Sequence, residues 1–394
     1  MQRSLPLLVI LLLLSVGLFS LLRRPAESTA IAPPPRLSSL ALPPDWNQLN
    51  ALPSLTNSEN LRHSLKSIYA LPNSSEDYLE FRDSALVIQP QSTSESETFI
   101  LPLSLAPSED TPAPLPPLNQ LHIAIDPGHI GGDYAIIEQR NFDPTPDDPS
   151  DTPVREGDLT LTTARHLKPL LENLGCQVTL LRDSPHPVTD ATPEDFLPEY
   201  PDRATAEKLF YRTAEIRARA HLVNNIIKPH LILCLHYNAD AWNGENPWAK
   251  NNHFHILLHG AYMKPELALD DQRFEMIRHL LTQTTERALP LARTISDHFL
   301  SKTELVPYHY KPTAPAIHLD KQRPIYARNL LANRLYQAPT IFMEPYVMNH
   351  QDTFHRVQLG DYEGLQEING QLKPSLVREY AQLLAEAIKI HYQK

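Results

Sequence analysis

The sequence is poor in cysteine, glycine and basic residues, and each shortage excludes a class of protein. Its 394 residues include only two cysteines, Cys176 and Cys234, so at most one bridge can form and no disulfide framework holds the fold together. Both lie in apolar, strand-like runs, which is typical of buried free thiols. Eleven glycines against 38 prolines indicate stiff connections rather than flexible linkers. A net charge of −11 argues against nucleic acid as a partner, because phosphate binding needs clustered lysine and arginine.

The N-terminus has the pattern of an export signal. After Arg3, the uncharged run Leu5–Leu22 is long for a signal-peptide core and just long enough to span a bilayer. We interpret residues 1–24 as an uncleaved signal anchor or a signal peptide. Ala30-Ile-Ala32 resembles a cleavage site, although Pro33 directly after it disfavours cutting. In both cases we expect the rest of the chain to work outside the cytoplasm.

Two proline-rich segments divide the remaining chain. Residues 25–56 are rich in Pro, Ser and Ala and predict a stiff, largely unfolded linker. Residues 57–106 combine one helical pattern with short strand candidates, and we interpret them as a small α+β module of unknown role. Residues 107–118 form a second proline-rich hinge, and residues 119–394 form the main domain.

The main domain alternates strand and helix patterns. The expected strands are 121–126, 176–182, 230–236, 253–259 and 339–344, and the expected helices are 157–174, 204–227, 270–300 and 374–392. This alternation predicts an α/β fold with a mainly parallel, twisted sheet and helices on both faces. The long loops 134–155, 183–203 and 301–335 are expected to be functional rims or local insertions.

Four polar residues stand where this fold places its chemistry. His129 follows the first strand, Glu156 opens the first helix, and His236 and Glu344 each end an apolar strand. The carboxyl ends of parallel strands and the amino ends of the following helices share one edge, so these residues are expected to converge. Taken singly, His129 would be an ordinary loop histidine and Glu156 a glutamate favoured by the helix dipole. Together, two imidazoles and one carboxylate are a ligand set of catalytic zinc, and Glu344 suits the general base.

The segments around these residues resemble those of the zinc-dependent N-acetylmuramoyl-L-alanine amidases of the bacterial cell wall, the Amidase_3 type. The matching motifs, in chain order, are Ile125-Asp-Pro-Gly-His-Ile-Gly-Gly132, Arg155-Glu-Gly-Asp-Leu-Thr-Leu161 with the helix and strand through Arg182, Arg219-Ala-His-Leu-Val-Asn224 with Leu231-Ile-Leu-Cys-Leu-His-Tyr-Asn-Ala239, and Phe342-Met-Glu-Pro-Tyr-Val-Met-Asn349. The resemblance covers roughly residues 121–392. It implies a zinc amidase fold for residues 119–394.

Carried over residue by residue, the resemblance makes His129, Glu156 and His236 the ligands of one zinc ion and Glu344 the catalytic carboxylate. The chain departs from the family pattern at Ile130, which is inserted after the histidine, and in the loop 134–155, where Glu138 is a weaker rival ligand.

Other polar residues have weaker claims to the site. His253 and His255 alternate along a strand and have a small chance of lining the site, Arg182 is expected to anchor a strand end, and Asn238 to shape the substrate pocket.

Two insertions, 184–212 and 260–290, are candidates for narrowing the site or changing the substrate. We expect the helix at 270–300 to serve in packing, with a plug over the zinc as the alternative. The acidic loop 138–158 is most simply a solvated surface.

The resemblance therefore implies a bacterial hydrolase that cuts the amide between N-acetylmuramic acid and L-alanine in peptidoglycan. We expect it in the periplasm, anchored to the inner membrane through residues 4–22 if the N-terminal segment is not cleaved. Two alternatives remain open: a related zinc peptidase acting on another amide, and a catalytically silent peptidoglycan-binding or scaffolding protein of the cell envelope. Intact Glu344 counts against the silent protein. Activation by a partner protein stays open, and the sequence does not identify that partner.

Overall fold

The computed structural model describes residues 37–52, 58–89, 98–103, 114–145, 150–241 and 246–393. The proposed export segment, residues 1–24, lies outside these ranges, as does most of the hinge at 107–118. Among the helices that the structure describes, none is both long enough and apolar enough to cross a membrane.

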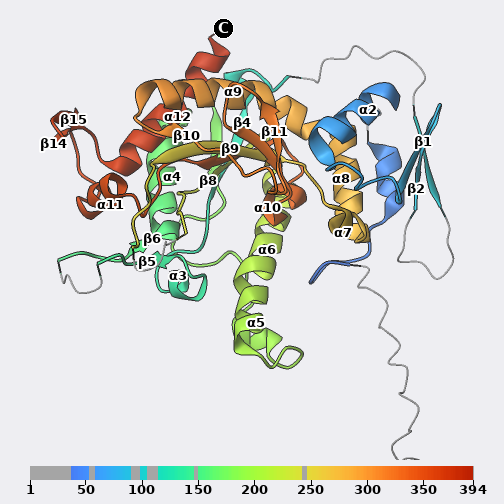
Figure 1. The fold of residues 1–394 in the computed structure, drawn as a ribbon, viewed down its shortest axis with the longest axis horizontal. Helices are drawn as coiled ribbons and strands as arrows, with labels where there is room; N and C mark the ends of the chain where they lie inside the picture. The colour runs from blue at the N-terminus through green and yellow to red at the C-terminus, as the bar shows by residue number, and fades with distance from the viewer. Residues whose placement is uncertain are drawn as a thin grey trace, which may run out of the picture. The chain divides into compact units, whose positions relative to one another are not determined.

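An eight-stranded sheet forms the centre of the described chain (Figure 1). Its strands are β4 (His122–Pro127), β7 (Gln177–Leu180), β8 (Leu231–Leu235), β9 (His253–His259), β10 (Val306–Pro307), β11 (Ile317–Asp320), β12 (Ile325–Arg328) and β13 (Thr340–Glu344). They are arranged in the order β11-β12-β9-β13-β8-β4-β7, with β10 paired to the start of β9. All five predicted strands are present within a residue or two of their expected bounds.

The sheet is mainly parallel, as predicted, since five of its seven strand pairings are parallel, but it also contains two antiparallel pairings. Strands β13, β8, β4 and β7 are parallel, but β9 runs antiparallel to β13, and β11 runs antiparallel to β12. The described residues between β8 and β9, 236–241 and 246–252, contain no crossover helix of the kind that usually joins parallel strands. The α/β class is confirmed, and the antiparallel β9 brings a further strand to the edge where β13 ends.

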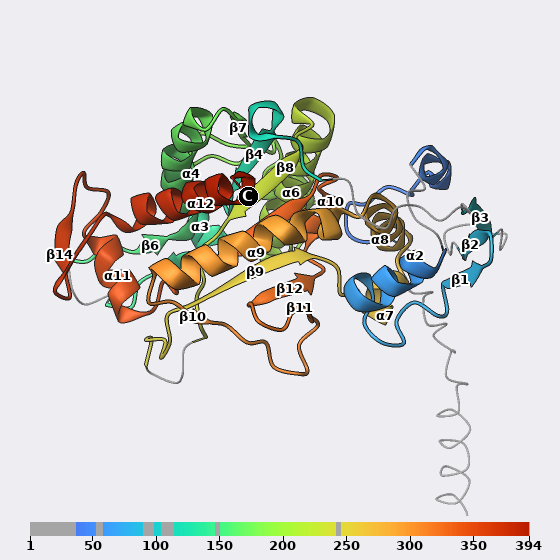
Figure 2. The same cartoon turned by 90° about the horizontal axis from the view of Figure 1, so that it is seen from above.

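Helices cover both faces of the sheet (Figures 1 and 2). The alternating residues Leu231, Leu233 and Leu235 of β8 point into a core shared with α4, α9 and α12. Ile232 and Cys234 point the other way, toward α6 and α10. These helices are α4 (Glu156–Asn173), α6 (Glu215–His221), α9 (Thr284–Lys302), α10 (Leu331–Leu335) and α12 (Leu376–Tyr392). Both cysteines are buried and free.

Two predicted helices differ in detail from the structure. The helix expected at 204–227 is a run of α5 (Arg203–Lys208), a π-helical turn, α6 and a second π-helical turn, Leu222–Ile227. The helix expected at 270–300 is broken into α8 (Asp270–Thr282) and α9 at Gln283, whose φ is 52°. A residue with positive φ cannot continue a right-handed helix, so α8 and α9 pack on different cores.

The long loops and the other connections contain short elements that the apolar pattern did not reveal. These are α3 (Tyr134–Ile137), β5 (Asn141–Phe142), β6 (Val154–Arg155), η4 (Pro193–Phe196), α7 (Lys264–Leu267), α11 (Gln351–Gln358), β14 (Gln366–Ile368) and β15 (Gln371–Lys373). Loop 301–335 supplies β10, β11, β12 and α10.

The segment before the main domain contains α2 (Ser58–Ser64), the π-helical turn Leu65–Tyr69, and an antiparallel sheet of β1 (Leu79–Arg82), β2 (Ala85–Ile88) and β3 (Phe99–Pro102). Its apolar side chains, such as Leu61 and Leu86, share one core with Phe274 and Ile277 of α8. The α+β content of this module was predicted. Its core, however, is completed by the main domain.

Two expectations are corrected here. Residues 37–52, expected as unfolded linker, include the 3-10 helix η1 (Trp46–Ala51), because Leu49 is buried in the shared core and Trp46 packs edge-on against Phe274 at 5.6 Å. Insertion 260–290 was a candidate for narrowing the site or changing the substrate. Its helices α7 and α8 contribute instead to the core that the main domain shares with the N-terminal module.

The packing role expected for the helix at 270–300 is confirmed.

Candidate active site

Three of the four predicted residues meet at one edge of the sheet. His129 lies just after β4, Glu156 is the first residue of α4, and His236 lies just after β8. One ligand atom from each lies within 4.8 Å of the others, and no other such group of metal-binding side chains occurs in the described residues. Strand ends and a helix start from three distant segments therefore bring together two imidazoles and a carboxylate.

The Glu156 carboxylate lies between the two imidazoles. Its Oε2 is 3.2 Å from Nε2 of His129, and its Oε1 is 3.2 Å from Nδ1 of His236. The backbone N–H of Tyr237 also donates to Oε1, at 3.1 Å. The two imidazole rings stand nearly perpendicular, with centroids 5.0 Å apart. The carboxylate is thus fixed at the centre of the group.

The carboxylates of Glu156 and Glu138 place negative charge next to His129. Desolvation alone would lower the pKa of His129, but the carboxylates of Glu156 and Glu138 outweigh it and raise that pKa to about 9. Desolvation would likewise raise the pKa of Glu156, but His129 and His236 hold it well below its usual range. Two imidazoles around an anionic carboxylate are a donor set that suits catalytic zinc.

Glu344, the fourth predicted residue, ends β13 beside this group. Desolvation raises the pKa of its carboxyl to about 7, although the charges of His236 and His129 oppose the shift. The ring of His236 stacks on Phe342, two residues earlier on β13, with centroids 5.2 Å apart. Glu344 is therefore a carboxyl poised to exchange a proton near neutral pH.

Glu138, the rival ligand, lies on the other side of His129. Its Oε1 is 3.6 Å from Nδ1 of His129, and its Oε2 accepts a hydrogen bond from the backbone N–H of Ile130 at 2.7 Å. It contacts the nitrogen opposite to the one that faces Glu156. Glu138 therefore orients the imidazole rather than joining the ligand group. Arg140, from the same loop, lies 3.5 Å from Glu156 and is half exposed.

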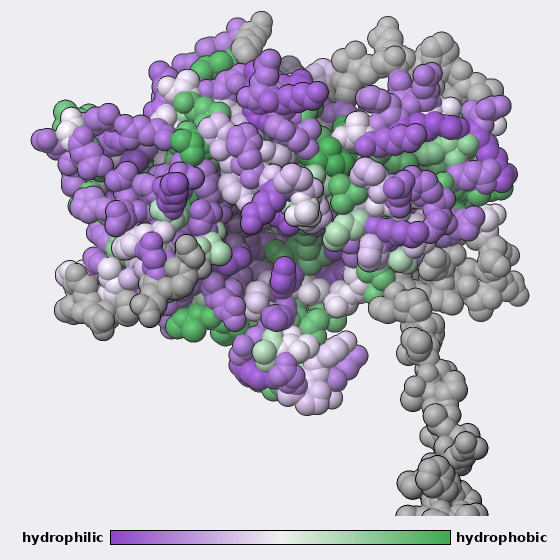
Figure 3. All heavy atoms as spheres, in the orientation of Figure 1, coloured by the Kyte–Doolittle hydropathy of each residue, from purple (hydrophilic) through white to green (hydrophobic). Residues whose placement is uncertain are grey.

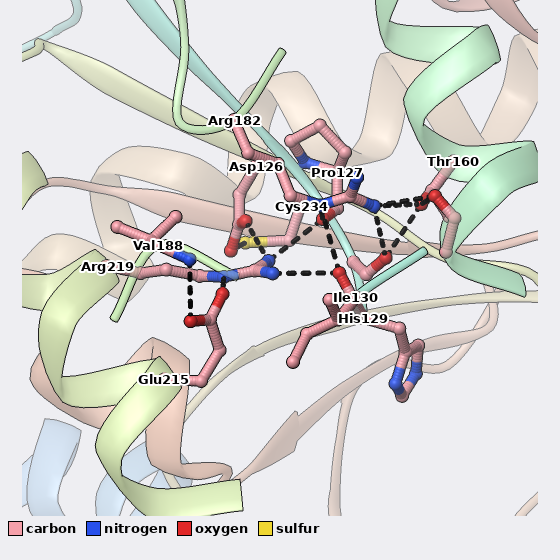
Figure 4. A network of polar contacts seen from close by, with 12 residues as sticks. Asp126, Pro127, His129, Ile130, Thr160, Arg182, Val188, Glu215, Arg219 and Cys234 are labelled. Atoms are coloured by element: carbon pink, nitrogen blue, oxygen red, sulfur yellow. Dashed lines mark hydrogen bonds and ion pairs between the residues drawn. The ribbon is translucent and has the colours of Figure 1, made fainter. Parts of the chain in front are cut away.

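The turn that carries His129 is held by two buried arginines (Figure 4). Arg219 of α6 donates to the carbonyl oxygens of Pro127 and His129, both at 2.8 Å, and pairs with Asp126 at 2.7 Å. Arg182 donates to the carbonyl oxygen of His129 at 3.0 Å and to that of Gly157 at 2.6 Å. Arg182 was expected to anchor a strand end, and it holds this turn. In the sequence, Arg219 was noted only as part of the third motif. Its spacing of four residues from Glu215, which suits an ion pair on one helix, was the signal that could have singled it out.

Two glycines let the chain segments of the site approach one another. A Cβ on Gly128 would lie 2.4 Å from the ring of His236, and a Cβ on Gly157 would lie 2.1 Å from the carbonyl oxygen of Ile130. Neither position tolerates a side chain without movement of the backbone. The inserted Ile130 is fully buried, and His129 before it has φ 61°, which presents its ring to Glu156.

The weaker candidates from the sequence, Asn238, His253 and His255, lie on the side of Glu344. Asn238 contacts His255, with 3.5 Å between Nδ2 and Nδ1, and His253 pairs with Asp240 at 3.0 Å. Both histidines are buried on the sheet face that also carries Glu344. On the side shown in Figure 3, the surface is mostly hydrophilic and is hollowed between the part that carries α3 and the arm formed by α5 and α6.

Comparison with known proteins decides the family. The family model for N-acetylmuramoyl-L-alanine amidase, Amidase_3, matches residues 123–369. The chain belongs to this family. It is therefore an enzyme that hydrolyses the amide between N-acetylmuramic acid and L-alanine in bacterial peptidoglycan, and its place is the extracytoplasmic cell envelope. None of the curated proteins matches the chain.

Solved structures of bacterial amidases are similar to this chain at low sequence identity. The amidase AmiC2 of Nostoc punctiforme has 14% sequence identity and a TM-score of 0.39, with 70% of this chain and 98% of that chain covered. The amidase Ami1 of Mycobacterium smegmatis has 15% identity and a TM-score of 0.40, with 69% and 97% covered. The CwlD amidase of Clostridioides difficile, solved with the GerS lipoprotein, has 14% identity and a TM-score of 0.40, with 69% and 96% covered.

Proposed function

We propose that this amidase uses one zinc ion held by His129, Glu156 and His236, with Glu344 as its catalytic carboxylate. The observation that supports the proposal most is the convergence of three ligand atoms within 4.8 Å of one another beside Glu344. Zinc bound there would polarise the scissile carbonyl and make the attacking water more acidic.

The protein's own residues supply the rest of the reaction. The Glu344 carboxylate accepts the proton of the water that attacks the amide carbonyl, and then donates it to the leaving nitrogen of L-alanine. Desolvation raises the pKa of this carboxyl above its ordinary value, which suits both steps, because the group can take up and release a proton more evenly than an exposed carboxylate. Glu138 and the two buried arginines keep His129 in place during the reaction.

We also propose the finer location and organisation. The uncharged run at residues 4–22 anchors the enzyme to the inner membrane, residues 25–36 act as a linker, and the catalytic domain begins near residue 119. Fractionation tests the anchor: the full chain should stay with membranes after alkaline extraction, and a soluble chain without residues 1–24 would show cleavage instead.

Digestion of purified peptidoglycan tests the catalytic proposal. The full chain, purified in detergent, should free stem peptides that begin with L-alanine, and a chelator should stop the release until zinc is added back. Bound zinc at unit stoichiometry with no release would favour the scaffolding protein. Release of peptides with another amino terminus would favour a zinc peptidase.

A further inference from the structure

The face of the sheet that carries Glu344 continues across β9 into a second group of polar side chains. Glu344 of β13 pairs directly with His255 of β9 in the antiparallel register. Residues opposed in this way project from the same face, with Cβ atoms roughly 5 Å apart. His255 is therefore the neighbour of Glu344 across the strands, in the direction that leads from β13 to β9 and away from His129, Glu156 and His236.

His255 leads outward to a tyrosine and an arginine. Its Nε2 is 3.2 Å from the hydroxyl of Tyr310, and Nη1 of Arg328 donates to the same hydroxyl at 3.2 Å. The Arg328 guanidinium also lies over the Tyr310 ring, 5.3 Å from its centroid. Both residues are half-buried and come from the loop region 301–335. Together they fix the orientation of the guanidinium.

No carboxylate among the described residues pairs with the guanidinium of Arg328, whereas other arginines of this part of the fold have such partners. Arg323, in the turn before β12, pairs with Asp297 and Asp320. Near the reaction centre, Arg219 pairs with Asp126 and Glu215. Arg328 keeps further N–H donors for a ligand, and a guanidinium binds a carboxylate with two parallel hydrogen bonds.

We propose that Arg328, oriented by Tyr310 and His255, binds a free carboxylate of the peptide stem whose amide is cut at Glu344. This inference rests on the proposed function. The path from Glu344 through His255 and Tyr310 is on the order of 10 Å, about three residues of extended peptide. A carboxylate on the second residue of the stem lies within that reach. The subsite places the peptide over β9 and β12 and leaves the other side of the metal-binding group for the glycan.

The test compares two soluble muramoyl tripeptides with lysine as third residue and an amidated C-terminus. They differ in one group: the second residue carries a free α-carboxylate in one and a carboxamide in the other. The wild-type chain should prefer the carboxylate, and Arg328→Gln should lower kcat/KM for it by about 10-fold to 100-fold, mostly through KM. The rate on the carboxamide should change less than about 2-fold, which also shows that the variant is folded.

Matched variants decide which arginine is responsible. Tyr310→Phe keeps the ring but removes the shared hydroxyl, and should reduce the preference without abolishing it. Arg323→Gln, whose partners are Asp297 and Asp320, should leave the preference unchanged. Loss of the preference in Arg140→Gln instead of Arg328→Gln would overturn the inference, as would equal loss on both substrates in Arg328→Gln.

The outcome with the wild-type chain separates this inference from the proposed function. Hydrolysis of both substrates at equal rates would overturn the carboxylate subsite and leave the amidase intact. No hydrolysis of these substrates or of peptidoglycan would overturn the proposed function, and this inference with it.

Discussion

Arg219 donates a hydrogen bond of 2.8 Å to the carbonyl oxygen of His129, and so ties a buried helix to the turn that carries the first proposed zinc ligand. The same guanidinium pairs with Asp126 and Glu215, and all three side chains are almost fully buried. The position of the imidazole therefore depends on a buried ion-pair network.

Replacing Arg219 should destabilise the fold and weaken zinc binding. In Arg219→Met, Asp126 and Glu215 lose their shared cation, and an uncompensated buried charge costs about 3–5 kcal/mol. Urea unfolding measures the loss. Arg217→Gln on the same helix is the control, because its contacts are with Ser38 and Ser39 near the surface. Equal stability of the two variants would contradict the role of Arg219.

The proposed ligands should differ from Glu138 in their effect on zinc. His129→Ala, Glu156→Ala and His236→Ala should each abolish stoichiometric binding. Glu138→Gln keeps all three ligands and should weaken binding by about 10-fold to 100-fold, because only the partner of the imidazole changes. Titration with a competing chelator measures both effects. If Glu138→Gln loses zinc as completely as Glu156→Ala, then Glu138 is a ligand.

Glu344→Gln should keep zinc and lose hydrolysis. The amide cannot accept a proton, and general base catalysis contributes about 10²–10⁴-fold to the rate. The wild-type rate should fall on acidification through a pH at or below about 7, because the carboxyl must be ionised to act and the charge of a bound zinc ion would oppose the rise of its pKa. Peptide release across a pH series measures the profile. Loss of zinc in Glu344→Gln would mean that this residue is a ligand.

The free energy of unfolding should decrease as the pH is lowered, because His259 is buried as a neutral imidazole. Desolvation lowers the pKa of His259 to about 3, from an ordinary value near 6.5, so between these limits the unfolded chain binds the extra proton. The stabilisation is complete above about pH 6.5 and is lost as the pH falls toward 3. The loss should be about 2 kcal/mol between pH 7 and pH 5.

Thermal unfolding at a series of pH values checks this dependence. His259→Asn should unfold at a lower temperature at pH 7 but with a shallower dependence on pH. His309→Asn, at an exposed position, should keep the wild-type dependence. A slope that is unchanged in His259→Asn would contradict the assignment.

The N-terminal module should unfold together with α8. Leu61 is 1% exposed and lies in the core that includes Phe274 and Ile277, so Leu61→Ala should cost about 2–5 kcal/mol. Hydrogen exchange of the α8 amides should speed up in this variant. Leu42→Ala is the control, because Leu42 is 82% exposed. Unchanged exchange in α8 would show that the module and the main domain unfold separately.

Much of the proposed zinc site, His129, Glu156 and His236, could be predicted from the sequence. His129 and His236 follow short apolar strands, and Glu156 opens a helix, so their places depend on local patterns that the chain carries in each segment. When strands and helices alternate in a parallel sheet, the carboxyl ends of the strands and the amino ends of the helices lie at the same edge of the sheet, and this does not depend on how the loops fold. The helix start favoured Glu156 over Glu138 as the ligand already in the sequence, but the contact of Glu138 with the opposite nitrogen of His129 depends on how the loop before that helix folds.

The sequence by itself therefore determined the α/β class, the five main strands and the residues that meet at their ends, because hydrophobic periodicity and strand-end polarity are local signals. Only the tertiary structure decided the direction of β9, the position of His255 opposite Glu344, the approach of Arg219 and Arg328, and the packing of α8 on the N-terminal module. These depend on which distant surfaces are buried against each other, and an apolar pattern in one segment does not specify its partner.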